Sequence, residues 1–138
     1  MDIEEIKDAI ALRYPYLLVD RVVESDGEKL VALKNVTINE PFFQGHFPEP
    51  GPSVMPGTMI VEGMAQVSGL LARKVLGEEG IGYLVGVDGA KFRQKVTPGD
   101  QLILKAEKNR VRSSLCKVDV KAFVDEELVA EAEITLAF

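Results

Sequence analysis

The stretch PGTMIVEGMAQVSGLLARKVLG (residues 56–77) has the features of one long helix. Pro56 suits the first helical position, where its missing N–H is no loss, and Gly77 suits the residue just past the end. Between Gly57 and Ala72 the only charged residue is Glu62, so apolar side chains cover almost the whole helix surface. We therefore predict a helix that is buried at the centre of the fold.

A membrane span is the competing interpretation of such an apolar helix. Glu62, Gln66, Ser68 and three glycines disfavour it, and no second apolar segment of this length follows. The first ten residues are acidic and have neither the basic start nor the apolar core of a signal peptide. We expect a cytoplasmic protein without a membrane span.

Strand patterns flank the helix on both sides. Apolar runs bounded by turn residues predict strands at 16–24, 30–36, 83–88, 91–96, 101–108, 115–124 and 127–138. A short helix is expected at residues 2–10, capped by Asp2, and the proline-rich segment 37–55 is expected to be a loop. One buried helix against many antiparallel strands is an α+β architecture, which we expect to form a single domain over residues 1–138. A sheet curled around the helix would bury it on several sides, and a dimer could cover the remainder.

Composition narrows the function classes. The single cysteine, Cys116, excludes an internal disulfide and a zinc site made of cysteines, and the net charge of −6 disfavours nucleic acid as a partner. Residues 91–121 nevertheless contain nine basic and three acidic side chains, a net charge of +6. This basic segment could steer an acidic partner, or it could be the solvated face of a sheet.

Thr58, Glu62 and Gln66 follow one another at intervals of four residues and so form one polar stripe on the predicted helix. Burial would raise the pKa of the Glu62 carboxyl group and make it a proton donor near neutral pH. The alternative is a structural acid that is hydrogen-bonded to Gln66 or to a loop amide.

His46, the only histidine, lies in the loop before this helix. Alone it could be an ordinary polar residue. His46 can serve as a base, Glu62 as an acid, and the free N–H groups of a helix start at Gly57 as hydrogen-bond donors. These groups are needed to remove a proton next to a carbonyl and to expel a β-hydroxyl group. Composition and spacing allow this reaction without singling it out.

Four segments resemble the successive signatures of the β-hydroxyacyl-acyl-carrier-protein dehydratases of fatty acid synthesis. They are RYPYLLVDRV (13–22), NEPFFQGHFP (39–48), VMPGTMIVEGMAQ (54–66) and VDGAKFRQKVTPGDQL (87–102). The resemblance implies a hot-dog fold, a long central helix wrapped by a curved antiparallel sheet. It also implies dehydration of (3R)-3-hydroxyacyl-acyl carrier protein to the trans-2-enoyl product, with no cofactor or metal. The implied assembly is a homodimer with active sites at the subunit interface, or three dimers in a hexamer.

The resemblance also implies roles for single residues. His46 matches the catalytic histidine, Glu62 matches the helix glutamate expected from the opposite subunit, and the Gly57 N–H matches the donor to the thioester carbonyl. Gln66 is expected to orient Glu62, and Met55 and Phe92 to line the acyl tunnel. Lys91, Arg93 and Lys95 are expected near the tunnel mouth, where the acidic acyl carrier protein, bearing the acyl group on its 4′-phosphopantetheine arm, would dock.

Two departures from the family pattern stand out. Residues 10–13 read IALR where the family usually has Leu-Pro-His-Arg, so a second histidine is missing. The segment HFPEPGPSVMPG (46–57) is two residues longer than usual, so the loop must bulge if His46 is to keep its place. A displaced His46 would change the chain-length preference or lower the activity.

Two other functions fit the same residues. A hot-dog thioesterase would use the carboxylate to activate water and release a free acid. A non-catalytic acyl-carrier or acyl-chain binding protein would tolerate a displaced His46. In the family that the chain resembles, the dehydratase that also isomerises the double bond carries aspartate at the helix position, so the resemblance implies dehydration alone for Glu62.

Overall fold

The computed structural model describes residues 1–77 and 80–138. In chain order the elements are α1 (Ile3–Ala9), β1 (Arg21–Ser25), β2 (Lys29–Asn35), the 3₁₀ helix η1 (Pro41–Gln44), α2 (Gly57–Leu76), β3 (Tyr83–Phe92), β4 (Gln101–Arg112), β5 (Leu115–Val124) and β6 (Glu127–Ala137). The six strands form one sheet in the order β1-β2-β4-β5-β6-β3, and every neighbouring pair is antiparallel.

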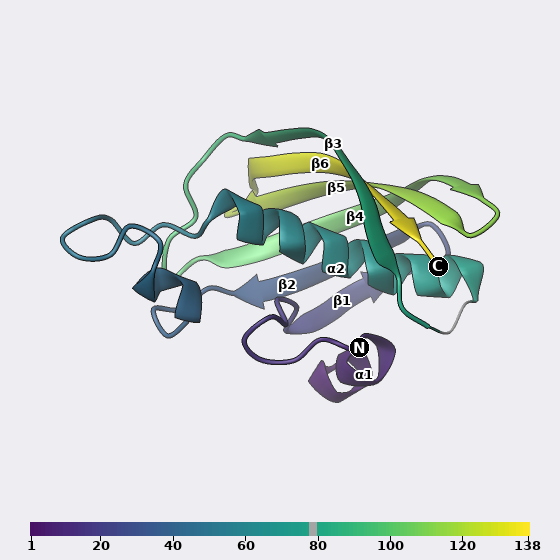
Figure 1. The fold of residues 1–138 in the computed structure, drawn as a ribbon, viewed down its shortest axis with the longest axis horizontal. Helices are drawn as coiled ribbons and strands as arrows, with labels where there is room; N and C mark the ends of the chain where they lie inside the picture. Colours follow the sequence, from purple (N-terminus) through teal and green to yellow (C-terminus); the bar gives the residue numbers. More distant parts are fainter. Residues whose placement is uncertain (78–79) are drawn as a thin grey trace.

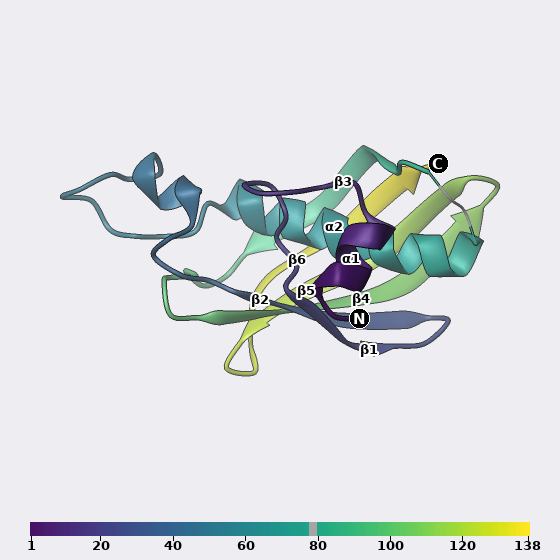
Figure 2. The same cartoon turned by 90° about the horizontal axis from the view of Figure 1, so that it is seen from below.

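The long helix α2 lies along one face of this sheet and contacts β2, β4, β5, β6 and β3, while the sheet curves beneath it (Figures 1 and 2). This arrangement confirms the predicted hot-dog fold. The helix side chains Met64, Val67 and Leu71 are fully buried. Burial of a side chain of this kind stabilises the fold by about 1.5–3 kcal/mol.

The ends of both helices follow from local sequence. The Asp2 side chain accepts from the Glu5 N–H and the Glu5 side chain accepts from the Asp2 N–H, so the predicted capping box is present. Gly77 ends α2 in the left-handed region at φ 64°, as predicted for the residue past the helix end. The helix itself begins at Gly57, with Pro56 as its N-cap.

The prediction of a strand beginning at residue 16 is wrong, because β1 begins only at Arg21. The chain before it is held by a helix side chain instead of a neighbouring strand. Gln66 accepts from the Leu18 N–H at 2.8 Å and donates to the Tyr16 carbonyl at 2.6 Å. A single amide side chain thus replaces the ladder of a strand pair here.

The two strands predicted at 83–88 and 91–96 are in fact one strand, β3, which ends at Phe92. A β-bulge between Asp88 and Lys91 interrupts its pairing with β6, and Gly89 within the bulge has φ 61°. Glycine adopts this conformation without a steric penalty, so the chain crosses the bulge and continues the strand.

The predicted loop 37–55 contains η1 and then the segment that carries His46. Figure 1 shows this segment projecting beyond the end of the sheet, next to the start of α2. The fold therefore brings His46 to the helix N-terminus.

Candidate functional site

His46 is fixed by both its backbone and its ring. Its N–H donates to the Phe42 carbonyl at 2.9 Å, which ties it to η1, and its Nδ1 lies 2.7 Å from the Val54 carbonyl oxygen. A carbonyl oxygen can only accept, so in the neutral imidazole Nδ1 carries the hydrogen and Nε2 has the lone pair. The half-buried ring therefore presents Nε2 as a possible proton acceptor.

The hydrogen bond between His46 and Val54 also joins the two ends of the lengthened segment. Because Val54 is the partner of the His46 ring, the residues between them project outward without changing the separation of their ends. Phe47 has φ 54°, and the Gly51 N–H donates to the Pro48 carbonyl at 2.9 Å. A Cβ atom at Gly51 would lie 2.8 Å from the Phe47 carbonyl oxygen, so this tight turn needs glycine.

A hollow of about 640 Å³ brings together most of the predicted site residues. His46, Met55, Gly57, Phe92, Arg93 and Lys95 all line it. Gly57 is the first residue of α2, so its N–H has no partner within the helix and can donate to an oxygen in the hollow. A Cβ atom at Gly57 would lie 3.0 Å from the Phe92 ring, so glycine also allows this aromatic side chain to pack over the helix start.

Glu62 lies one and a half turns further along α2 and is half-buried. Burial raises the pKa of its carboxyl group, and a hydrogen bond from Gln66 Nε2 to Oε1 at 3.0 Å opposes that rise only in part. Gln66 is itself held by Tyr16 and Leu18, so its amide has a fixed direction. Thr58, the third member of the predicted polar stripe, is exposed.

His46 and Glu62 do not share a hollow. Glu62 and Gln66 line a second one, also of about 640 Å³, between residues 7–13, α2 and the start of β3. One chain therefore presents the histidine with the helix start, and separately the glutamate with its amide partner.

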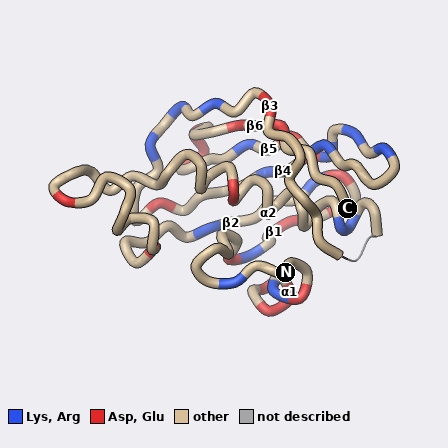
Figure 3. Tube along the Cα trace, viewed as in Figure 1, with Lys and Arg blue, Asp and Glu red and all other residues tan. Residues whose placement is uncertain are grey.

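The basic residues predicted at the tunnel mouth lie in the last part of β3 and directly after it. Lys91, Arg93 and Lys95 are exposed, and Figure 3 shows basic residues in sequence along this part of the trace. Arg93 and Lys95 line the histidine hollow, whereas Lys91 does not. Arg93 also forms an ion pair with Glu131 at 3.2 Å.

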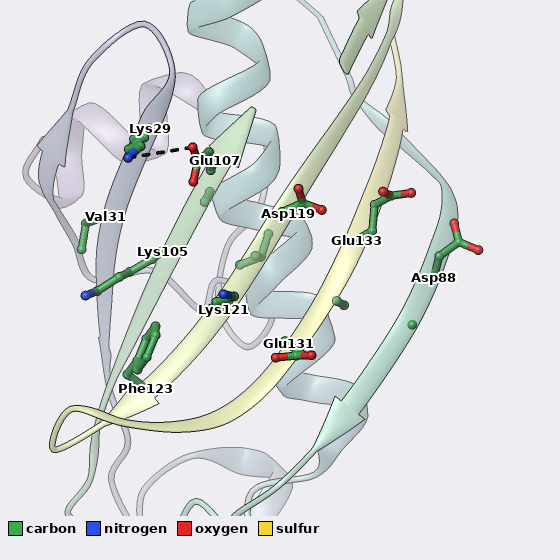
Figure 4. A pocket seen from close by; sticks show the side chains of 14 residues that line it. Lys29, Val31, Asp88, Lys105, Glu107, Asp119, Lys121, Phe123, Glu131 and Glu133 are labelled. Carbon is green, nitrogen blue, oxygen red and sulfur yellow. Dashed lines mark ion pairs between the residues drawn. The ribbon is translucent and has the colours of Figure 1, made fainter. Parts of the chain in front are cut away.

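A third hollow, of about 530 Å³, lies on the face of the sheet away from α2 (Figure 4). Its carboxylates include Glu107, Asp119 and Glu133, which stand opposite one another on β4, β5 and β6. Within the described part of the chain, no group of three or more His, Cys, Asp or Glu residues is suited to hold a metal ion. The described helices likewise include none with the length and apolarity needed to cross a membrane.

A family model described as the FabA-like domain matches residues 10–133. The chain belongs to this family.

Named relatives of this FabA-like chain cover almost its whole length. It is 50% identical to a 3-hydroxyacyl-[acyl-carrier-protein] dehydratase FabZ of Listeria monocytogenes, over 99% of this chain and 95% of the relative. A protein of the same name from Thiobacillus denitrificans is 51% identical over 97% and 94% of the two chains.

Solved structures of much lower identity share the fold. The dehydratase heterocomplex ApeI:P from Xenorhabdus doucetiae contains a chain that superposes with a TM-score of 0.80 at 15% identity, covering 96% of this chain and 89% of that one. A hypothetical thioesterase with coenzyme A from Streptococcus pneumoniae gives a TM-score of 0.69 at 17% identity, covering 85% and 83%. At such identities the likeness concerns the fold alone.

Reasoning from sequence missed several residues that hold the FabA-like site together. Tyr16 and Leu18 fix Gln66, and an ion pair of the buried Lys34 with Glu40 holds the N-cap of η1, which precedes the histidine-bearing segment. One signal for Lys34 is present in the sequence, because it is in phase with the buried Leu30 and Ala32 of the same strand. Tyr16 and Leu18 bind Gln66 through backbone atoms, so their side-chain types give no sign of these contacts.

Proposed function

We propose that this chain dehydrates (3R)-3-hydroxyacyl-acyl carrier protein to the trans-2-enoyl thioester during fatty acid elongation. Relatives at 50–51% identity over nearly their full length are named 3-hydroxyacyl-[acyl-carrier-protein] dehydratases, so the chain is an enzyme of that class. The observation that carries the mechanism is the placement of the His46 ring, with its Nδ1 bonded to Val54, in one hollow with the Gly57 N–H.

His46 acts as the base in this mechanism. The substrate thioester lies with its carbonyl oxygen at the start of α2, where the Gly57 N–H donates to it. His46 Nε2 removes a proton from C2, and negative charge develops on the carbonyl oxygen. Met55 and Phe92 form walls of the hollow and keep water away from the acyl chain.

Glu62 acts as the acid. Its raised pKa favours the protonated form, which can donate a hydrogen bond and then a proton to the hydroxyl group on C3. The C3–O bond breaks as the double bond between C2 and C3 forms, and water leaves. The imidazolium then loses its proton to solvent, and the carboxylate takes one up. Gln66 keeps the carboxyl group aimed at the hydroxyl.

A second copy of the chain completes the site, because His46 and Glu62 line different hollows of one chain. Strand β3 supports a homodimer. Among the described residues it pairs only with β6, along one side, and nine of its ten residues are exposed, including Tyr83, Leu84 and Val85. An apolar strand with a free edge is suited to pair with another chain. Lys91, Arg93 and Lys95 would then dock the acidic carrier protein beside the histidine hollow.

Mixing two inactive variants tests the shared site. His46→Ala and Glu62→Ala should each lower the dehydration rate by about 10²- to 10⁴-fold, because each removes an acid or base group. In a mixed dimer one site would carry both substitutions and the other none. Random exchange of subunits should therefore restore about a quarter of wild-type activity in a symmetric dimer.

The measurement is enoyl product formed after the two variants are mixed under conditions that exchange subunits. Each variant mixed with itself is the control. Restoration absent from a mixture with proven exchange would contradict the shared site. A free acid as the product would favour a thioesterase, and carrier binding without any product would favour a binding protein.

A further inference from the structure

Lys34 is a charged residue at a core position of β2. It is 7% exposed and follows Leu30 and Ala32 on the face of the strand that turns toward the core. Burying a lone ammonium group is costly, so a buried lysine needs close partners. Its Nζ lies 3.0 Å from Glu40 Oε1 and 3.7 Å from Asp20 Oδ2.

The Glu40 carboxylate also binds the turn that leads to η1. Its Oε2 accepts from the Thr37 N–H at 3.0 Å and from the Thr37 hydroxyl at 2.9 Å. Partial burial alone would raise the pKa of Glu40, but the hydrogen bonds from Lys34 and Thr37 outweigh it and lower the pKa. Glu40 is therefore a carboxylate whose two oxygens are both engaged.

A continuous set of hydrogen bonds then runs from Glu40 to His46. Glu40 is the N-cap of η1, and its carbonyl accepts from the Phe43 N–H at 3.1 Å. The carbonyl of Phe42 accepts from the N–H groups of Gly45 and His46, at 3.3 and 2.9 Å. The segment from 40 to 46 is thus one short rigid unit that stands on the Lys34 ammonium group.

We propose that Lys34, through its ion pair with Glu40, is a positioning residue for the imidazole of His46. The inference rests on the proposed function of His46 as the base. The ring bonds to Val54 through Nδ1 and stacks on the Phe47 ring at a centroid distance of 4.1 Å, and the backbone of His46 is fixed through η1. Phe43 keeps η1 packed on the core without the ion pair, so loss of the ion pair should shift the Glu40 end of η1 and with it the His46 ring relative to the helix start at Gly57.

The test uses Lys34→Met, which shortens the unbranched side chain by one atom and removes the charge. Lys29→Met is the matched control, because Lys29 lies on the same strand and pairs with Glu107 at 3.8 Å on the surface. We expect Lys34→Met to lower kcat about 10- to 100-fold with KM nearly unchanged, since small misplacements of reacting groups have effects of that size. Lys29→Met should keep the wild-type kcat.

A second substitution separates positioning from general damage. If Lys34 acts only through His46, adding Lys34→Met to His46→Ala should not lower the residual rate further. An equal loss in both backgrounds would overturn the proposal. If Lys34→Met does not fold, Glu40→Gln decides in its place, because it keeps the shape of the side chain and removes its charge.

The imidazole can also be observed directly. The chain has one histidine, so the ring ¹⁵N signals belong to His46 alone. Wild type should show the Nδ1–H form, and Lys34→Met or Glu40→Gln should show exchange between the two neutral forms. An unchanged spectrum in both variants would overturn the proposal. If His46→Ala kept near-normal dehydration, the proposed base would be wrong, and the spectrum alone would decide whether Lys34 positions the ring.

Discussion

The two edges of the sheet are built in opposite ways. Strand β1 has five residues, a bulge and charged side chains, and Met1 covers its outer side by exchanging two hydrogen bonds with Val22, each 2.9 Å long. Strand β3 has ten residues, exposes five large hydrophobic side chains and has no covering segment among the described residues. Short, charged and covered edges resist pairing, whereas long apolar edges invite it.

The difference bears on which edge would pair in the proposed dimer. Residues of the same chain cover the β1 edge, so the contacts at that edge stabilise a single copy of the chain. The β3 edge borders both hollows, since Leu84 lines the one with Glu62 and Phe92 lines the one with His46. A partner at β3 would therefore cover apolar surface and complete the chemistry in one step.

The largest expected effect comes from breaking the β3 edge. Val85 is 56% exposed on β3, and Val23 is 48% exposed on β1, so Val85→Lys and Val23→Lys form a matched pair. Val85→Lys should convert the protein to monomers and lower dehydration by about 10²-fold or more, because each site loses the acid of the other chain. Val23→Lys should leave both properties unchanged. Sedimentation velocity and enoyl formation measure them, and a dimeric, active Val85→Lys would show that β3 is not the interface.

A middle-sized effect should follow from charge at the end of β3. Lys95→Glu places an acid beside the histidine hollow, and Arg21→Glu makes the same change on exposed β1. We expect the first to raise KM for an acyl-carrier substrate about tenfold at low salt, because the carrier is acidic and rim charges act on encounter. KM for the same acyl group on a small thiol should not change, nor should Arg21→Glu affect either substrate. An equal rise for both substrates would argue against carrier docking.

The smallest expected effect is on how the free energy of unfolding depends on pH, through Glu62, which lines the same hollow as the start of β3. Because burial raises its pKa above the ordinary 4.5, the folded state binds the proton more tightly than the unfolded state. Stability is therefore lost as the pH rises from the unfolded pKa through the folded one. Glu62→Gln should remove this loss and be more stable by under about 1 kcal/mol at neutral pH, since water screens a half-buried group. In acid the two proteins should be equally stable.

Urea unfolding at fixed protein concentration across this pH range is the measurement, because the stability of a dimer depends on concentration. Gln66→Leu cannot serve as its control, since Gln66 also holds the chain at Leu18. Glu24→Gln is a suitable one, as it makes the same change at an exposed residue of β1 that lines none of the hollows described above. A wild-type protein that gains stability over Glu62→Gln with rising pH would contradict the raised pKa.

Local sequence was sufficient for α2 and for most of the sheet. The helix predicted over 56–76 forms at Gly57–Leu76, and β5 (Leu115–Val124) forms at the strand predicted over 115–124, with Cys116, Val118, Val120 and Ala122 buried on one face. It was insufficient at residues 16–18, which Gln66 holds, since the first bond to strand β2 comes at Asp20. The break predicted between two strands at Gly89 was also wrong, because pairing with β6 on both sides of the bulge keeps β3 continuous.

For the site, sequence by itself determined the residue types and their order: the single histidine, the glycine at a helix start and the lone carboxylate on an apolar helix. These depend on composition and local periodicity, which the chain carries without folding. Only the tertiary structure decided that His46 bonds to Val54 across the lengthened loop, that Lys34 pairs with Glu40 ahead of that loop, and that Glu62 faces another hollow. Such relations join residues far apart along the chain, and packing of α2 against the sheet creates them.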